Sequence, residues 1–307
     1  MLLQLFNSST PKPLNTTSIT LFQKNKMVLV VMLFLLGMMA LLLIGPYFFP
    51  KGYAEPTSMP FASPSWQHWC GTDLNGRDLF YRMLTGGTIS LLVGFAGALI
   101  TLFIGTSYGM IAGYLGGWCD AGMTRFIDIL YSIPRLIFIL IFINAFNERL
   151  QQTANHLGWS WLVGSSRILI LIVSLGLIEW LTMARLVRGQ TLSLKERSFV
   201  AAAQILGERP VTILWRHIFP NLLGVLMVTL TLSIPAVIID EAFLSFLGLG
   251  VQAPMASLGS LLAEGAAAIN PLRGAWWILL FPAFLLLLLL ITLNYLGNEL
   301  REFHLKK

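Results

Sequence analysis

Charge is scarce in this sequence of 307 residues. Only 11% of the residues are Asp, Glu, Lys or Arg, whereas 56% are hydrophobic. A soluble globular domain carries about 25% charged residues, and a chain this apolar could not bury all of its nonpolar side chains. A lipid bilayer removes the need to bury them. The composition therefore excludes an ordinary soluble domain and indicates a membrane protein.

Cysteine and the common catalytic motifs are also scarce or missing. Cys70 and Cys119 do not make a disulfide framework, and we interpret them as free thiols at opposite membrane faces. The dipeptide Gly-Lys never occurs, which excludes a P-loop, and the zinc-binding motif H-E-x-x-H is absent. The four histidines are scattered. The sequence thus predicts no metal site, no cofactor and no catalytic residue.

Long apolar segments are what the sequence has in their place. A helix needs roughly 20 apolar residues to cross a bilayer. The first such segment, Met27–Phe49, is too long for the core of a signal peptide, and no small-residue cleavage site follows it, so we interpret it as a retained anchor. Five more segments bring the predicted total to six transmembrane helices in an all-α membrane protein: Thr88–Met110, Phe126–Phe146, Ile168–Val187, Leu222–Phe246 and Trp276–Leu296.

The basic residues predict the orientation of these spans. With both termini in the cytoplasm, the inner segments carry 14 of the 20 Lys and Arg residues, in agreement with the positive-inside rule. The same residues are dispersed between apolar runs, which argues against binding of nucleic acid. The predicted organisation is a cytoplasmic tail (1–26), a first transmembrane helix (27–49), an outer loop (50–85), a five-helix core (86–298) and a cytoplasmic tail (299–307).

A polar segment, Ser198–Asn221, interrupts the apolar pattern between the fourth and fifth spans. Gly207 can end one short helix in the left-handed conformation, and Pro210 can begin a second one, which we expect Pro220 to end. Apolar residues spaced i, i+3, i+4 and i+7 form one stripe on each short helix. These are Phe199, Ala202, Ala203 and Leu206 on the first, and Val211, Leu214, Trp215 and Ile218 on the second.

Neither short helix can cross a bilayer, and neither would be stable alone. Two surroundings fit them: the lipid headgroups, on which an interfacial elbow would lie, or a groove in a cytoplasmic partner protein. The small residues Ala201–Ala203 favour the partner because they allow a close approach. The spacing of the residues leaves both interpretations open.

Four stretches resemble one family of membrane proteins. Ser198–Asn221 resembles the "EAA" loop of ABC importer permeases in its Ala-Ala pair, the glycine four residues later and the terminal Phe-Pro-Asn, although Ala201 stands where the family usually has glutamate. Three other stretches resemble the oligopeptide, dipeptide and nickel branch, and especially its C-type permease subunit: HWCGTDLNGRDLFYRML (68–84), AGYLGGWCDAGMTRFIDILYSIP (112–134) and EAFLSFLGLGVQAP (241–254).

The resemblance implies a type I ABC importer permease fold in the inner membrane and transport of oligopeptides or dipeptides. It implies that two separate ATP-binding subunits hydrolyse ATP, that a second permease subunit forms the other half of the pathway, and that an external solute-binding protein delivers the solute. It also implies that Tyr114–Arg125 and Ser198–Asn221 contact the ATP-binding subunits. The implied contact residues of the second segment are Phe199, Ala201, Ala202, Ala203, Leu206, Gly207, Arg209, Arg216, His217, Pro220 and Asn221.

Charged residues near the predicted outer face form a second group of candidates. Asp73, Arg77 and Asp78 lie in the turn-rich GTDLNGRD stretch, where they pair locally or form a gate or docking surface for the binding protein. Charges at membrane depth are candidates for function. Glu241, at the end of the fifth span, therefore borders the solute pathway, lies near an interface or pairs with the sister subunit.

Two features of the sequence leave alternatives open. Gly105, Gly109 and Gly113 are spaced four apart, which predicts a close helix contact or a glycine-lined pathway. The alternative function is a self-contained secondary transporter or channel. Such a protein usually has more spans or inverted repeats with broken helices, and it does not need a cytoplasmic helix-turn-helix.

Overall fold

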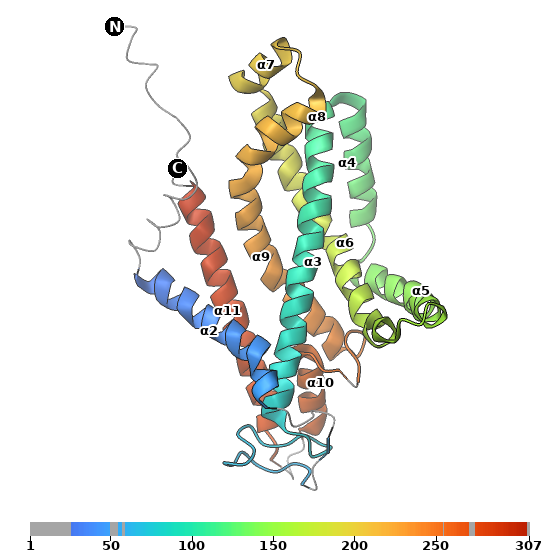
Figure 1. The fold of residues 1–307 in the computed structure, drawn as a ribbon, viewed down its shortest axis with the longest axis vertical. Coiled ribbons are helices and arrows are strands. Elements are labelled where there is room, and N and C mark those ends of the chain that lie inside the picture. The colour runs from blue at the N-terminus through green and yellow to red at the C-terminus, as the bar shows by residue number, and fades with distance from the viewer. Residues whose placement is uncertain (1–25, 50–54, 57–58, 254, 270–273, 306–307) are drawn as a thin grey trace.

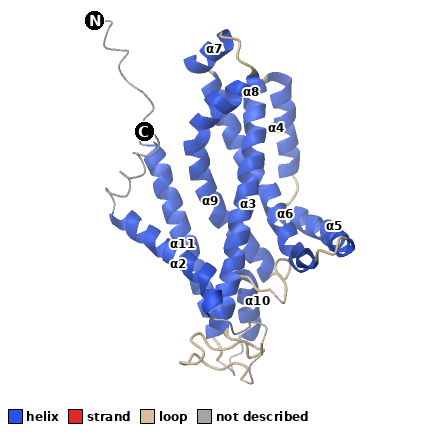
Figure 2. Ribbon diagram, in the orientation of Figure 1, coloured by secondary structure: helices blue, strands red, loops and turns tan. Residues whose placement is uncertain are grey.

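The computed structural model describes residues 26–49, 55–56, 59–253, 255–269 and 274–305. The tail predicted for residues 1–26 lies outside these ranges except for Lys26. Within the described ranges the chain consists of helices and loops and contains no β-strand, as predicted for an all-α protein (Figure 2).

Five helices are long and apolar enough to cross a membrane, and each coincides with one of the predicted spans to within one residue or extends beyond it. They are α2 (Lys26–Phe48), α3 (Leu79–Leu115), α6 (Ser160–Lys195), α9 (Phe219–Phe246) and α11 (Trp277–Leu305). With 37 residues, α3 is about 55 Å long, well beyond a hydrocarbon core of about 30 Å. α3 therefore begins within the predicted outer loop (50–85), and residues 299–305 of the predicted C-terminal tail are helical.

The third predicted span, Phe126–Phe146, is not one helix. It is divided between α4 (Gly117–Tyr131) and α5 (Arg135–His156), which meet at an angle of 88°. Pro134 explains the break, because proline has no N–H to donate and disfavours helical geometry in the residue before it. In Figure 1, α4 stands beside α3 whereas α5 projects to the side. A sixth span exists only if this bent pair is counted as one.

The polar segment folds into one short helix and the beginning of a long one. α7 (Ser198–Ile205) ends at the Gly207 turn, and α8 (Pro210–Ile213) then continues through a π-helical turn, η1 (Leu214–Ile218), into α9. Pro220 does not end a helix, contrary to expectation. The amide N–H of Phe219 donates to the carbonyl of Leu214, so the wider turn shifts the hydrogen-bond register just before the proline. The side chain of Asn221 donates to the carbonyl of His217 at 2.7 Å.

A short apolar helix, α10 (Leu258–Ala268), was not predicted because its 11 residues cannot cross a bilayer. Its first turn is capped reciprocally: the Ser257 hydroxyl accepts from the Ser260 amide at 3.2 Å, and the Ser260 hydroxyl accepts from the Ser257 amide at 2.8 Å. The helix packs against α3, α9 and α11. In Figure 1 it lies at the end of the bundle opposite α7. We call these two ends the α7 end and the α10 end.

Three glycines bring α3 and α6 into close contact. A Cβ atom on Gly105 would lie 2.5 Å from Met183 Cβ, and one on Gly109 would lie 2.5 Å from the carbonyl oxygen of Ala184. Gly113 faces α6 in the same way, at 2.8 Å from the carbonyl oxygen of Arg188. The helix-packing interpretation is therefore confirmed, and a glycine-lined pathway at these positions is wrong because they face α6.

Gly109→Ala is expected to lower the thermal stability of the chain in detergent by about 1–3 kcal/mol, because an added methyl group meets the backbone of α6 and must push the helices apart. Gly189→Ala in α6 is the matched control, since a Cβ there meets nothing within 4 Å. The melting temperature, followed by tryptophan fluorescence, distinguishes the two variants. Equal melting temperatures would contradict the proposed close contact.

Candidate functional site

The α7 end holds the segment that the sequence analysis singled out. α7 packs on the start of the α8–α9 helix through Val200 and Ala203, which bury against Ile213 and Ile218. Met110 and Tyr114 of α3 and Val187 of α6 belong to the same apolar cluster. α7 therefore packs on α6 and on the α8–η1 start of the α9 helix, in a cluster that also includes residues of α3.

The buried side of α7 is not the predicted stripe. Of that stripe only Ala203 is buried, whereas Phe199, Ala202 and Leu206 are exposed, and so is Ala201. Leu206 is 80% exposed and the neighbouring Ile205 is 87% exposed. The predicted stripe thus lies mainly on the outer surface of the element, where an isolated chain offers it no protein contact.

The Gly207 turn has the geometry expected from the sequence. Gly207 has a φ angle of +77°, its N–H donates to the Gln204 carbonyl at 3.0 Å, and the next N–H, of Glu208, donates to the Ala203 carbonyl at 3.1 Å. This pair of bonds is a Schellman motif, which ends a helix at a left-handed residue. A Cβ on Gly207 would have nothing within 4 Å, so the turn is exposed at the tip of the molecule.

The polar candidates in this element differ in their surroundings. His217 Nε2 lies 2.9 Å from Glu208 Oε2, so its side chain closes the turn instead of pointing freely outward. Arg209 and Arg216 are exposed, and in the described part of the chain neither forms an ion pair. Pro220 and Asn221 are exposed at the start of α9.

The other predicted contact segment, Tyr114–Arg125, lies at the same end (Figure 1). It consists of the turn from α3 into α4 and the first half of α4, and its Trp118 is 96% exposed. Arg188 of α6 pairs with Asp120 through Nη2 and Oδ2 at 2.6 Å. The Lys195 ammonium lies 5.6 Å from the centre of the Tyr114 ring. Both segments are therefore anchored on the last turns of α6.

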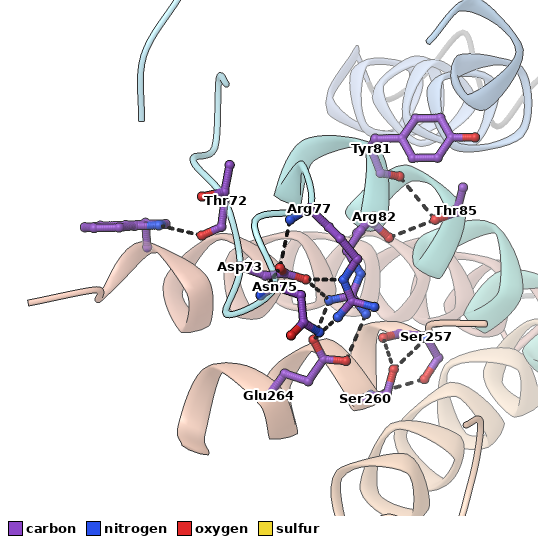
Figure 3. A network of polar contacts seen from close by, with 11 residues as sticks. Thr72, Asp73, Asn75, Arg77, Tyr81, Arg82, Thr85, Ser257, Ser260 and Glu264 are labelled. Carbon is purple, nitrogen blue, oxygen red and sulfur yellow. Dashed lines mark hydrogen bonds and ion pairs between the residues drawn. The ribbon is translucent and has the colours of Figure 1, made fainter. Parts of the chain in front are cut away.

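The GTDLNGRD stretch folds around Asp73 at the α10 end (Figure 3). One carboxylate oxygen of Asp73 accepts from the backbone amides of Asn75 and Arg77, at 2.8 and 2.9 Å. The other accepts from Arg77 Nε at 2.7 Å and from Arg82 Nη1 at 2.6 Å. Asp73 and Arg77 therefore pair locally, as one interpretation predicted.

Arg82 and Glu264 complete this network, and neither was predicted from the sequence as a site residue. Arg82 is 2% exposed in α3 and donates from Nη2 to Glu264 Oε1 of α10 at 2.8 Å. Buried arginines occur almost only with paired charges, so an arginine inside an apolar helix was the available signal. Its partner could not be predicted, because the two residues lie 182 positions apart in the chain. We call Asp73, Arg77, Arg82 and Glu264 the α10-end clasp.

Asp78 and Glu241 lie outside the clasp. Asp78 accepts from the Tyr81 amide at 3.0 Å at the start of α3, and it pairs with His68 Nδ1 at 2.9 Å. Glu241 is fully buried and accepts from the hydroxyl groups of Ser90 and Ser245, at 2.8 and 2.6 Å. Its carboxylate is thus enclosed by serines in the isolated chain, and its role at the solute pathway or the sister subunit stays a prediction.

These features define a class of protein: an all-α, multi-pass membrane protein with a small exposed helical element at one end and a polar clasp at the other. Residues 105–301 match the family described as "Binding-protein-dependent transport system inner membrane component". The chain belongs to this family of ABC importer permeases, which have the type I permease fold.

Relatives from several bacteria are similar over most of the chain. The oligopeptide transport system permease protein OppC of Haemophilus influenzae is 41% identical over 92% of this chain and 85% of its own length. The dipeptide transport system permease protein DppC of Bacillus subtilis is 37% identical over 91% of this chain and 82% of its own length. The OppC protein of Bacillus subtilis is 34% identical over 92% and 86%.

Asp73→Ala is expected to destabilise the chain by about 3–5 kcal/mol, because it removes one partner of the buried Arg82 guanidinium. Asp128→Ala is the matched control: Asp128 and its partner Arg185 are each 47% exposed, and such a pair contributes at most about 1 kcal/mol. Thermal unfolding of the purified variants in detergent measures the difference. Equal melting temperatures of the two variants would contradict a stabilising role of the clasp.

Proposed function

We propose that this chain is the C-type permease subunit of an ATP-driven importer of oligopeptides or dipeptides. Family membership makes it an importer permease in the inner membrane, and the relatives named as oligopeptide and dipeptide permeases support a peptide as the solute. The observation that carries the proposal is the α7 element, whose apolar outer surface has no cover in the isolated chain.

We assign the α7 end to the cytoplasm, where two ATP-binding subunits contact α7 and the α3–α4 turn. The chain itself has no P-loop, so ATP is hydrolysed in those subunits. A displacement of α7 passes through Val200 and Ala203 to Ile213 and Ile218, and from there into α9, because the helix is continuous from Pro210 to Phe246. Ala201 is exposed on α7, so this contact is apolar at the position where the EAA loop usually has glutamate.

A second permease subunit forms the other half of the pathway, and an external solute-binding protein docks at the α10 end. At that end, the Asp73–Arg77 pair and the Asp78 cap hold the loop before α3 in one shape. Their contribution to docking or gating is to maintain this surface, since Asp73 is itself buried.

The alternative, a secondary transporter or channel, draws some support from the broken helix at Pro134, because broken helices are common in such proteins. Family membership argues against it. So does the α7 element, which a self-contained transporter has no use for.

Gly207→Trp is expected to abolish ATP-driven uptake and co-purification of the ATP-binding subunits, while membrane insertion stays normal. A Cβ at this position meets no atom of this chain within 4 Å, so we attribute the loss to a blocked partner surface plus about 1–2 kcal/mol of backbone strain. Gly207→Asn is the control, because asparagine tolerates the left-handed conformation and adds little bulk. Normal uptake by Gly207→Trp would rule out a partner at this turn.

Thiol labelling tests the proposed orientation. Cys119 is exposed near the start of α4, whereas Cys70 is buried in the loop before α3. Burial disfavours the thiolate and raises the pKa of Cys70 to about 11, with a smaller contribution from Asp78. Since maleimides react with thiolates, Cys70 should stay unlabelled at pH 7–8 and react only as the pH approaches that value.

An impermeant maleimide should therefore label Cys119 in inside-out vesicles that contain the full chain, and not in right-side-out vesicles. Cys119→Ser serves as the control and should abolish labelling at neutral pH. Labelling of Cys119 from outside the cell would reverse the proposed orientation and with it the site of ATP-driven coupling.

A further inference from the structure

Three charged side chains from three different helices meet at the break between α4 and α5. Arg135, the first residue of α5, contacts the carboxylates of both Glu179 in α6 and Asp240 in α9. These residues are 44 and 105 positions away from Arg135 in the chain. The clasp at the α10 end and the contacts at the α7 end do not involve any of them. We call this group the midpoint triad.

The triad lies at membrane depth. Glu179 is near the middle of α6, about 24 Å from the end of that helix at Lys195. A hydrocarbon core is about 30 Å thick. Charged side chains at this depth are costly when they face lipid and are usually found facing a water-filled cavity or paired inside a bundle. The triad therefore requires water or polar groups around it in the assembled transporter.

The triad borders an open groove. A hollow of about 450 Å³ is lined by the α4–α5 break and by one side of α6, including Tyr131, Arg135, Glu179 and Thr182. Every residue from Tyr131 to Ile137 is exposed in the isolated chain. The Arg135 side chain is 40% exposed, and those of Glu179 and Asp240 are 14% and 23% exposed. Arg135 and Glu179 thus line the groove, and Asp240 adjoins it through its contact with Arg135.

Further polar pairs continue from the triad toward the α7 end. The hydroxyl groups of Tyr131 and Thr182 lie 2.8 Å apart, Arg185 donates to Asp128 at 2.6 Å, and the Arg185 guanidinium lies 4.1 Å from the centre of the Tyr131 ring. The α6 members, Glu179, Thr182 and Arg185, recur every three residues and so share one side of the helix. They form a polar track that leads from the triad toward the proposed cytoplasmic end.

The triad has a surplus of negative charge, since two carboxylates face one guanidinium. No other cation of the described chain pairs with these carboxylates. An ammonium group that enters the groove would balance the charge and replace water around the carboxylates. A lipid chain or an apolar protein surface would leave the surplus charge without compensation. The charge balance thus favours a cationic occupant in a water-filled groove.

We propose that this groove is part of the wall of the solute pathway and that Glu179 and Asp240 bind the α-ammonium group of a passing peptide. This inference rests on the proposed peptide-import function. When no peptide is bound, Arg135 holds the carboxylates of Glu179 and Asp240 together. When a peptide is bound, Arg135 can contact its C-terminal carboxylate. Every unmodified peptide carries an α-ammonium group whatever its side chains, so such a site accepts peptides of many sequences.

Reaction of an engineered thiol tests whether water reaches the groove. Thr182→Cys is made in a Cys119→Ser background, and the full importer is reconstituted in liposomes. We expect a cationic aminoethyl methanethiosulfonate to modify Thr182→Cys, whereas Leu36→Cys on the apolar helix α2 should stay unmodified although Leu36 is 53% exposed in the isolated chain. If Thr182→Cys is unreactive in the importer but reactive in the chain alone, the second permease subunit covers the groove and the proposal is overturned.

Charge selectivity tests the ammonium site. The cationic reagent should react about tenfold faster than the anionic sulfonatoethyl reagent, because opposite charges attract strongly in a partly desolvated groove. Glu179→Gln combined with Asp240→Asn should remove this difference. A merely structural role would change the reaction with both reagents alike. Equal rates for the two reagents before neutralisation would overturn the ammonium site.

Uptake of a free tripeptide separates this inference from the proposed function. The variant with Glu179→Gln and Asp240→Asn should take up the peptide about tenfold more slowly, in line with the loss of that electrostatic attraction. Glu148→Gln, an exposed carboxylate of α5 outside the groove, is the control and should behave as wild type. Normal uptake by the double variant overturns only this inference. If the wild-type importer shows no ATP-dependent peptide uptake, the proposed function is overturned as well. The two failures are distinguishable because the reagent assay measures thiol modification and needs no transport.

Discussion

The close contact between α3 and α6 is the constraint on which the rest of the structure depends. It requires glycine at three successive turns of α3, because the backbone and side chains of α6 occupy the space that a Cβ would need. Both helices are much longer than a bilayer is thick, so this one contact relates the two ends of the molecule. The apolar cluster under α7 takes residues from both of them, and the α10-end clasp takes Arg82 from the first turn of α3.

The two ends differ in how their polar groups are satisfied. At the α10 end, Asp73 and Arg82 are almost completely buried and joined across three segments of the chain, which favours a rigid loop region. At the α7 end, a short helix is held by a few apolar side chains and presents Ile205 and Leu206 to the outside. This difference agrees with the proposed function, in which the exposed α7 end contacts a partner that moves it and the rigid α10 end maintains a docking surface.

Particular residues show how far prediction from the sequence reached. The apolar segments predicted the spans, since lipid permits long apolar helices, and Gly207 predicted its turn because a helix ending of this kind needs a left-handed residue. Pro134 and Pro220 show the limit of such reasoning. One proline lies at an 88° break in a span, and the other lies within a continuous helix, directly after a π-turn. Local sequence did not distinguish the two cases.

The sequence by itself determined the membrane class, the number of apolar segments, the location of the exposed turn and the absence of a P-loop, because these depend on composition and on residues close together in the chain. Only the tertiary structure decided which side of α7 is buried, that Glu241 is enclosed by serines, and that Arg82 meets Glu264 and Arg135 meets Glu179 and Asp240. Those pairings join residues 44 to 182 positions apart. They form because helix packing brings the side chains together, and no local pattern in the chain records that packing.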